Sequence, residues 1–309
     1  MRVMVAGGNG QVGQCLIDRL KRSDLAWEAH GRATLDIADE RSVAEHLQRF
    51  KPSVLINAAA YTSVDKAEME PDVAARANIK GPATLAKLCR EHGCSILHIS
   101  TDYVFSGDAS VPYTPDDPVR PSGVYGATKL EGEYRIQDAC PNHVIMRTAW
   151  VFSEHGNNFM KTMLRLASER DKLQVVDDQQ GTPTYAGHIA DALLLVANRI
   201  STIDDSRLFG LYHYGGSDAV TWCGFARYIL DVALEKGLIN KLPKVNGITT
   251  ADFPTPARRP SYSVLDSTLL KKRFGIDPSD WKAGVNDSLN ALIAASAVRA
   301  KNAPNQVSA

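Results

Sequence analysis

The chain has 309 residues, 44% of them hydrophobic, and its 35 Lys and Arg residues balance its 35 Asp and Glu residues, which excludes a strong overall attraction to nucleic acid or anionic lipid. No apolar run approaches the roughly 20 residues that cross a bilayer, and the N-terminus lacks the ordered regions of a signal peptide. We therefore expect a cytoplasmic globular protein of one large or two modest domains, with no nucleic-acid or membrane partner.

Strand and helix patterns alternate through the first half of the chain. We predict strands at 2–6, 27–30, 54–57, 95–100 and 144–147, separated by helices at 11–21, 40–50, 71–92 and 123–139. Alternation of this kind predicts an α/β fold with a doubly wound parallel sheet covered by helices on both faces.

After about residue 150 the alternation is less regular. We predict helices at 159–170, 186–199, 221–236 and 269–275, a strand at 208–214, and a Pro-rich loop at 253–260. No clean linker separates the two halves, so we expect the second to pack closely on the first. Residues 301–309 are polar and are interpreted as a tail.

Glycines at positions 7, 10 and 13 follow the first predicted strand and open the first predicted helix. Gly7, Gly10 and Gly13 allow a tight turn, the approach of a pyrophosphate and close helix–strand contact. The helix N-terminus then offers free N–H groups and a partial positive charge. Three glycines alone could serve any tight turn, but their position at the start of an alternating chain favours a dinucleotide site.

The second predicted strand ends where a dinucleotide fold meets the adenosine ribose. An acidic residue there would repel a 2′-phosphate, whereas this chain has Arg32, which could bind that phosphate through its planar guanidinium. A solvated surface arginine is an equally good interpretation, so NADPH is only mildly favoured over NADH. Asp36 and Ile37 follow at a distance suited to the adenine edge.

Tyr125 and Lys129 lie four residues apart on one predicted helix, and this spacing places both on the same face. A nearby ammonium would lower the pKa of the phenol and make it a better proton donor to a carbonyl oxygen. The spacing alone is weak, since Tyr134 and Asp138 share it. Thr101 strengthens the interpretation, because it ends a predicted strand at the edge where α/β sheets bind ligands. Its alternative role is to cap backbone groups.

Several phrases of the sequence resemble the extended short-chain dehydrogenase/reductase family, from about Met1 to Trp281. The phrases are Gly10-Gln11-Val12-Gly13, Asn57-Ala58-Ala59-Ala60-Tyr61-Thr62, Ser100-Thr101-Asp102-Tyr103-Val104-Phe105, Val124-Tyr125-Gly126-Ala127-Thr128-Lys129-Leu130, Arg147-Thr148-Ala149-Trp150-Val151 and Pro256-Ala257-Arg258-Arg259-Pro260. Together they are more specific than the glycine loop.

The resemblance implies a Rossmann-type domain and a smaller, discontinuous C-terminal substrate domain. We assign 1–150 to the first, with returns near 181–216 and 245–265, and 151–180, 217–244 and 266–300 to the second. It also implies NAD(P)H-dependent reduction of the 4-keto group of dTDP-4-dehydro-6-deoxy-L-mannose to give dTDP-L-rhamnose.

The resemblance also implies residue roles. Thr101, Tyr125 and Lys129 take the catalytic positions, and Tyr125 would protonate the C4 oxygen while Lys129 holds the nicotinamide ribose. The predicted cofactor-binding residues are Gly7, Gly10, Gln11, Val12, Gly13, Arg32, Asp36, Ile37, Ala60, Tyr61, Thr62, Tyr125 and Lys129. The predicted substrate residues are Thr101, Asp102, Trp150 and Arg258, the last because a bidentate arginine suits a diphosphate.

One position departs from the family pattern. Members with a magnesium-bridged dimer carry a glutamate two residues after the third glycine, where this chain has Cys15, a poor ligand for a hard cation. We therefore predict no metal site and a monomer or homodimer of another kind. The five scattered cysteines are interpreted as free thiols of a reducing compartment.

Three other functions compete with this one. A non-catalytic NADP-binding regulatory subunit would keep the fold and steady a partner enzyme, and a reductase could act on a different nucleotide-linked 4-keto sugar. A 4,6-dehydratase or epimerase of the same fold is less favoured, because dehydratases of this group need an Asp-Glu pair and Tyr103 follows Asp102 here.

Overall fold

The centre of the protein is a six-stranded parallel sheet with the strand order β10-β5-β4-β3-β1-β2. The computed structural model describes residues 1–302, with side chains through residue 298. The strands are β1 (Arg2–Ala6), β2 (Ala26–His30), β3 (Val54–Asn57), β4 (Ser95–Thr101), β5 (His143–Thr148) and β10 (Gly210–His213). All five strand pairings are parallel, which confirms the predicted α/β fold.

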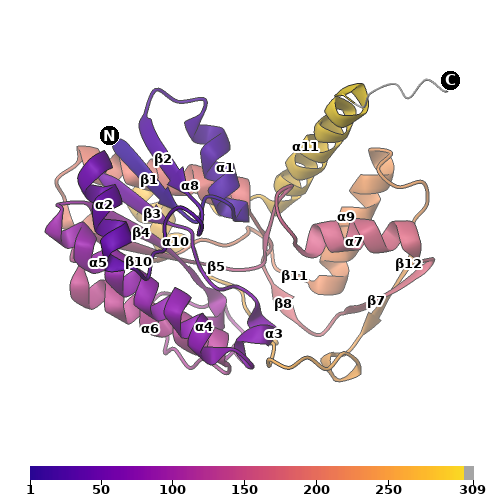
Figure 1. Cartoon of the computed structure of the whole chain (residues 1–309). Coiled ribbons are helices and arrows are strands. Elements are labelled where there is room, and N and C mark those ends of the chain that lie inside the picture. The colour runs from indigo at the N-terminus through magenta and orange to yellow at the C-terminus, as the bar shows by residue number, and fades with distance from the viewer. Residues whose placement is uncertain (303–309) are drawn as a thin grey trace.

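Helices cover both faces of the sheet because the strands are apolar on both faces. Val3 and Val5 of β1 belong to the apolar cluster that contains α1 (Gln11–Leu20) and α8 (Ala186–Thr202). Met4 and Ala6 belong to the opposite cluster, which contains α2 (Glu40–Phe50), α5 (Gly81–Glu91) and part of α6 (Val124–Ala139). Buried parallel strands with apolar residues on alternate sides produce this three-layer arrangement, seen in Figure 1.

The helix predicted at 71–92 is divided by a π-helical turn. It runs as α4 (Pro71–Ala75), the π-helical segment Arg76–Lys80 and then α5. Pro82 has no N–H for an i to i−4 hydrogen bond, so the regular pattern is interrupted just before it. The widened turn places Asn78 inward, where it is completely buried.

A second apolar cluster forms the core of a smaller unit beside the sheet (Figure 1). It contains α7 (Phe159–Glu169), α9 (Trp222–Glu235), α11 (Trp281–Asn302) and the paired strands β7 (Lys172–Val176) and β12 (Lys244–Ile248). Two short strand pairs are also present: β6 (Val151–Phe152) with β9 (Thr184–Tyr185), and β8 (Gln180–Gly181) with β11 (Val220–Thr221).

Two segments pack differently from the predicted division. Strand β12 pairs with β7, so residues 245–248 lie in the smaller unit rather than in a return to the sheet. Helix α10 (Thr268–Phe274) contacts β10 and α8, and Leu270 lies in the sheet's core cluster, so 268–274 belong with the sheet. Apolar periodicity identifies a buried helix face but not the core in which it is buried.

The remaining elements are short. They are helix α3 (Val64–Ala67) and the 3-10 turns at Asp102–Val104, Ser206–Leu208 and Thr250–Asp252. Within residues 1–302 no helix combines the length and the apolar character needed to cross a bilayer. Of the predicted tail 301–309, the first two residues end α11, and 303–309 lie outside the described residues.

Candidate active site

The glycine loop joins β1 to α1 in a conformation that requires its glycines. Gly7 has a φ of +86°, and its N–H and that of Gly8 each donate to the His30 carbonyl oxygen (2.9 Å). A Cβ on Gly13 would lie 2.2 Å from the Gly7 oxygen, so only glycine lets α1 begin so close to β1. Gly10 is the N-cap and has no side chain to cover the first N–H groups of α1. This helix N-terminus therefore fits a pyrophosphate.

A cavity of about 270 Å³ opens beside this loop. Its lining includes seven of the predicted cofactor residues: Gly7, Gly10, Arg32, Asp36, Ile37, Ala60 and Tyr61. Gln11, Val12, Gly13 and Thr62 lie outside the lining. The cavity spans the ends of β1, β2 and β3, where the adenosine half of a dinucleotide fits.

Arg76 is a lining residue that the sequence patterns did not single out. It forms an ion pair with Asp36 at the mouth of the cavity. Burial alone would raise the pKa of Asp36, but hydrogen bonds from the Ala38 N–H (3.0 Å) and from Arg76 hold that pKa below its usual value. Arg32 is exposed and lies on the same cavity. Two guanidinium groups, those of Arg32 and Arg76, therefore line this cavity.

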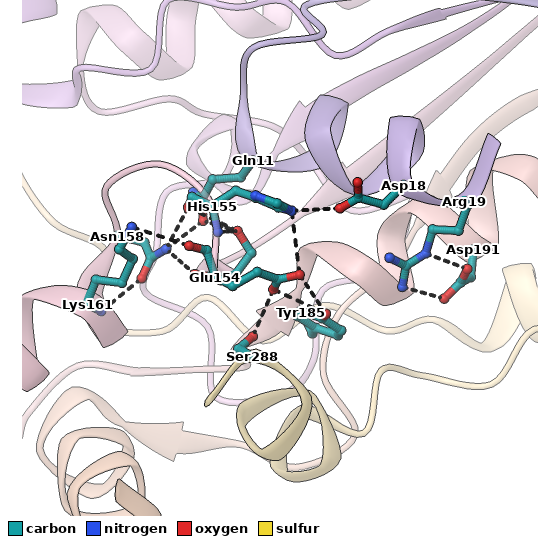
Figure 2. A network of polar contacts seen from close by, with 11 residues as sticks. Gln11, Asp18, Arg19, Glu154, His155, Asn158, Lys161, Tyr185, Asp191 and Ser288 are labelled. Atoms are coloured by element: carbon teal, nitrogen blue, oxygen red, sulfur yellow. Dashed lines mark hydrogen bonds and ion pairs between the residues drawn. The ribbon is translucent and has the colours of Figure 1, made fainter. Parts of the chain in front are cut away.

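The Gln11 side chain is hydrogen bonded to residues of the smaller unit (Figure 2). Its side-chain oxygen accepts hydrogen bonds from Ser153 Oγ (3.0 Å) and Asn158 Nδ2 (2.9 Å). Asn158 also caps α7 by accepting from the Lys161 N–H (3.1 Å). The start of α1 is thereby fixed to the start of α7, one helix from each unit.

Thr101 and Tyr125 come together at the carboxyl end of β4. Thr101 ends the strand, and Tyr125 lies in the first turn of α6. A Cβ on Gly126 would lie 2.1 Å from the Tyr103 oxygen, so this glycine allows α6 to approach the turn after β4. The Tyr103 and Tyr125 rings meet edge to face, 5.4 Å apart. Burial raises the pKa of Tyr125, and the neighbouring Thr101 hydroxyl partly opposes that rise.

Lys129 shares the face of α6 with Tyr125, but its ammonium is directed to β4. It is 2% exposed, and its Nζ donates to the Ile99 carbonyl oxygen (2.7 Å) and lies 3.1 Å from His98 Nε2. Burial lowers its pKa to about 8, against the effect of Glu133. The prediction that a nearby ammonium lowers the pKa of Tyr125 is therefore wrong for this arrangement, since burial dominates and raises it.

Asn57 and His98 support Lys129 and were not predicted. Asn57 Nδ2 lies 2.9 Å from His98 Nδ1, and Asn57 Oδ1 accepts from the Ala59 N–H (3.1 Å). Both side chains are completely buried. Burial and the neighbouring Lys129 hold the pKa of His98 well below its usual value, so the ring is neutral. Two polar residues inside otherwise apolar strands were the available signal.

Trp150 packs against both the core cluster of the smaller unit and the cluster around Phe105, and its predicted role in the sugar site stays a prediction. Its φ is +48°, and its ring stacks on Trp222 with centroids 3.5 Å apart and planes 9° apart. A Cβ on Gly181 would come within 2.5 Å of the Trp150 ring. Trp222 was missed because the helical pattern around it suggests only an apolar face.

The remaining predicted substrate residues differ in exposure. Arg258 is exposed, whereas the neighbouring Arg259 forms an ion pair with Asp65 (2.6 Å) and acts electrostatically on Tyr103. Asp102 is only 4% exposed and accepts a hydrogen bond from Thr101 Oγ1 (3.0 Å). The roles predicted for Arg258 and Asp102 stay predictions.

The region around Cys15 does not suit a hard cation. Cys15, Glu154 and His155 have potential ligand atoms within 4.8 Å of one another, but burial raises the pKa of the thiol to about 12 and keeps it protonated. His155 Nε2 pairs with Asp18 (3.0 Å), and Glu154 accepts a hydrogen bond from the Tyr185 hydroxyl (3.2 Å; Figure 2). These groups already satisfy one another, and magnesium prefers oxygen ligands.

Comparison with known proteins agrees with this geometry. The family described as "RmlD substrate binding domain" matches residues 1–294. A dTDP-4-dehydrorhamnose reductase from Aggregatibacter actinomycetemcomitans is 44% identical over 93% of this chain and 97% of that protein. The Escherichia coli K12 protein of the same name is 39% identical over 96% of this chain and 100% of that protein.

Solved structures of similar fold include members of the same family. The dTDP-4-dehydrorhamnose reductase from Bacillus anthracis, solved in complex with NADP, is 32% identical, has a TM-score of 0.87 and is matched over 94% of this chain and 99% of that one. A Thermus thermophilus UDP-glucose 4-epimerase shares the fold at 20% identity, with a TM-score of 0.78 over 96% of this chain and 100% of that one. The chain belongs to the dTDP-4-dehydrorhamnose reductase family.

Proposed function

We propose that this protein uses NADPH to reduce the C4 carbonyl of dTDP-4-dehydro-6-deoxy-L-mannose, giving dTDP-L-rhamnose. The observation that carries the proposal is the meeting of Thr101 and Tyr125 at the carboxyl end of β4, next to the strand ends that line the glycine-loop cavity. Ligands of open α/β sheets bind at this edge. The near full-length relatives named as reductases support this chemistry.

The residues divide the reaction between them. When bound, NADPH supplies the hydride that C4 accepts. Tyr125 donates its phenolic proton to the C4 oxygen, and its raised pKa keeps that proton in place at neutral pH. Thr101 hydrogen bonds the phenol and the developing charge. Lys129 would hold the nicotinamide ribose, and Trp150 with Trp222 would form an apolar wall for the sugar.

The direct test is loss of reduced-nicotinamide absorbance when the purified protein meets freshly made dTDP-4-dehydro-6-deoxy-L-mannose. We expect NADPH to be oxidised in proportion to the sugar substrate that is consumed, and we expect NMR to identify dTDP-L-rhamnose as the product. Oxidation with a different 4-keto sugar alone would change the proposed substrate. Cofactor binding without any oxidation would replace the proposal with the regulatory-subunit function.

We expect Arg32→Leu to raise the KM for NADPH by roughly 10- to 100-fold, because a charged hydrogen bond to a 2′-phosphate contributes about 1.5–3 kcal/mol. The KM for NADH should stay within a factor of two or so, since NADH has no 2′-phosphate. Steady-state rates with both cofactors measure the effect. Arg41→Leu is the matched control, because Arg41 is an exposed helix residue paired with Glu45.

Arg76→Leu tests which of the two guanidinium groups of the cavity binds the 2′-phosphate. If Arg76→Leu raises the KM for NADPH while Arg32→Leu does not, Arg76 binds the 2′-phosphate and the role predicted for Arg32 is wrong. If neither variant changes the ratio of the two KM values, the cavity does not discriminate between the cofactors.

We also propose that the enzyme works in the cytoplasm as a monomer or homodimer. All five cysteines are buried free thiols, which a reducing compartment preserves. Sedimentation analysis of the purified chain decides the oligomeric state.

A further inference from the structure

Asp102 is a buried carboxyl group in which only one of the two oxygens has a hydrogen-bond partner among the described residues. Its Oδ1 accepts from Thr101 Oγ1 (3.0 Å), while Oδ2 has no hydrogen-bond partner among the described side chains. The other nearby hydroxyl is that of Ser263, which hydrogen bonds the Gln180 carbonyl oxygen (3.4 Å) and also lowers the pKa of Asp102, although less than burial raises it. A buried carboxylate without a cation and with an unpartnered oxygen is costly, whereas a neutral carboxylic acid is not. The surroundings therefore favour the protonated form.

The single proton of Thr101 has two possible acceptors. Thr101 Oγ1 already accepts from the Tyr103 N–H (3.2 Å), which leaves one lone pair and one O–H. When Asp102 is ionised, that O–H donates to Asp102. When Asp102 is protonated, its own O–H can donate to Thr101, and the Thr101 proton is then free for Tyr125. The protonation state of Asp102 thus decides whether Thr101 donates its hydrogen bond to Asp102 or to Tyr125.

We propose that Asp102 is a positioning residue that acts through Thr101: its carboxylic acid proton directs the Thr101 hydroxyl to Tyr125 and replaces the proton that Tyr125 gives to the substrate. The inference rests on the proposed reduction and deepens it. As Tyr125 protonates the C4 oxygen, the Thr101 proton moves to the phenolate and the Asp102 proton moves to Thr101. Tyr125 ends protonated, Asp102 ends ionised, and solvent protonates Asp102 after turnover.

The environment of Asp102 sets the direction of the pH dependence. Burial raises the pKa of Asp102 to about 7, despite hydrogen bonds that lower it. The titratable groups that face it are Tyr103 on the following turn and Tyr125 on α6, and Arg259 acts on Tyr103. The proton is present below about pH 7 and is lost as the pH rises through that value. The kcat for reduction should therefore fall above about pH 7.

Asp102→Asn tests the relay, because an amide has similar size but cannot release a proton. We expect kcat below pH 7 to fall roughly 10- to 100-fold, the effect of a lost hydrogen bond to a charged group, with KM nearly unchanged. The fall of kcat near pH 7 should disappear in the variant. Cofactor binding, followed by nicotinamide fluorescence, shows that the variant is folded. A raised KM with the pH profile intact would overturn the relay and leave Asp102 as a substrate contact.

Thr101 provides a second, independent test. In a Thr101→Val background, Asp102→Asn should have no further effect on kcat, because the carboxyl group acts only through that hydroxyl. Thr101→Ser keeps the hydroxyl and should keep the pH dependence. Additive losses in the double variant would contradict the proposal.

Infrared difference spectroscopy needs no turnover and so separates this inference from the proposed function. The wild-type protein at pH 6 should show the C=O stretch of a protonated carboxyl group that Asp102→Asn lacks. If that band is present but no sugar is reduced, the proposed function fails and the protonation of Asp102 stands. If sugar is reduced without the band, the relay fails and the reductase stands.

Discussion

Replacing Tyr125 by Phe should lower kcat by about 10²- to 10⁴-fold, the contribution expected of a positioned general acid. The phenol lies beside Thr101 at the carboxyl end of β4, and burial raises its pKa, so it holds a proton to donate at neutral pH. Phenylalanine keeps the edge-to-face contact with Tyr103, so the fold and the cofactor affinity should change little. Stopped-flow oxidation of NADPH measures the loss at the hydride-transfer step.

Tyr134→Phe is the matched control, because Tyr134 lies on the same helix, is 44% exposed and has the same spacing to Asp138. Its kcat should equal that of the wild-type protein. Near-normal turnover by Tyr125→Phe, with cofactor affinity unchanged, would move the acid role to another group. Asp102 would then be the first candidate, because its pKa is raised to about 7.

The central sheet could be predicted because its strands are short apolar runs between amphipathic helices. A parallel sheet follows from that alternation, and all five strands predicted in the first half are present close to the predicted bounds. The short pairs β6–β9 and β8–β11 were not predicted, since two-residue strands have no periodicity. Helix α10 was assigned to the wrong unit, because packing partners are a tertiary property.

In the active site, too, local motifs could be predicted from the sequence, whereas contacts between distant segments could not. Thr101 and Tyr125 are recognised from a motif and a strand end, and the structure brings them together. The direction of the Lys129 side chain could not be predicted from spacing, because it is set by His98 of β4, which Asn57 of β3 holds in turn. The same applies to Arg76, whose position depends on the π-helical turn in front of Pro82. Contacts between distant segments are what a local pattern cannot contain.

An ion pair between β5 and α6 has the largest expected effect on the stability of the fold. Arg147 of β5 and Glu133 of α6 form a bidentate ion pair, with Nε–Oε1 at 2.9 Å and Nη2–Oε2 at 2.6 Å, and the side chains are 4% and 1% exposed. Arg147→Met should lower the free energy of unfolding by about 3–5 kcal/mol, because it leaves the Glu133 carboxylate buried without a partner. Urea titration followed by circular dichroism measures the change.

The double variant Arg147→Met with Glu133→Leu should recover most of that loss, since two apolar side chains replace the pair without leaving a buried charge. Arg165→Leu is the matched control, because its pair with Glu169 is exposed at 60% and 47%, and should cost about 0–1 kcal/mol. Equal destabilisation by the single and double variants would mean that packing around Arg147, including its contact with the Phe105 ring at 5.1 Å, matters more than charge. Glu133 also acts on Lys129, so the double variant should lower the pKa of that amine further and shift the pH range in which it carries charge. The ion pair would then link the stability of the β5–α6 packing to the protonation state of the active-site lysine.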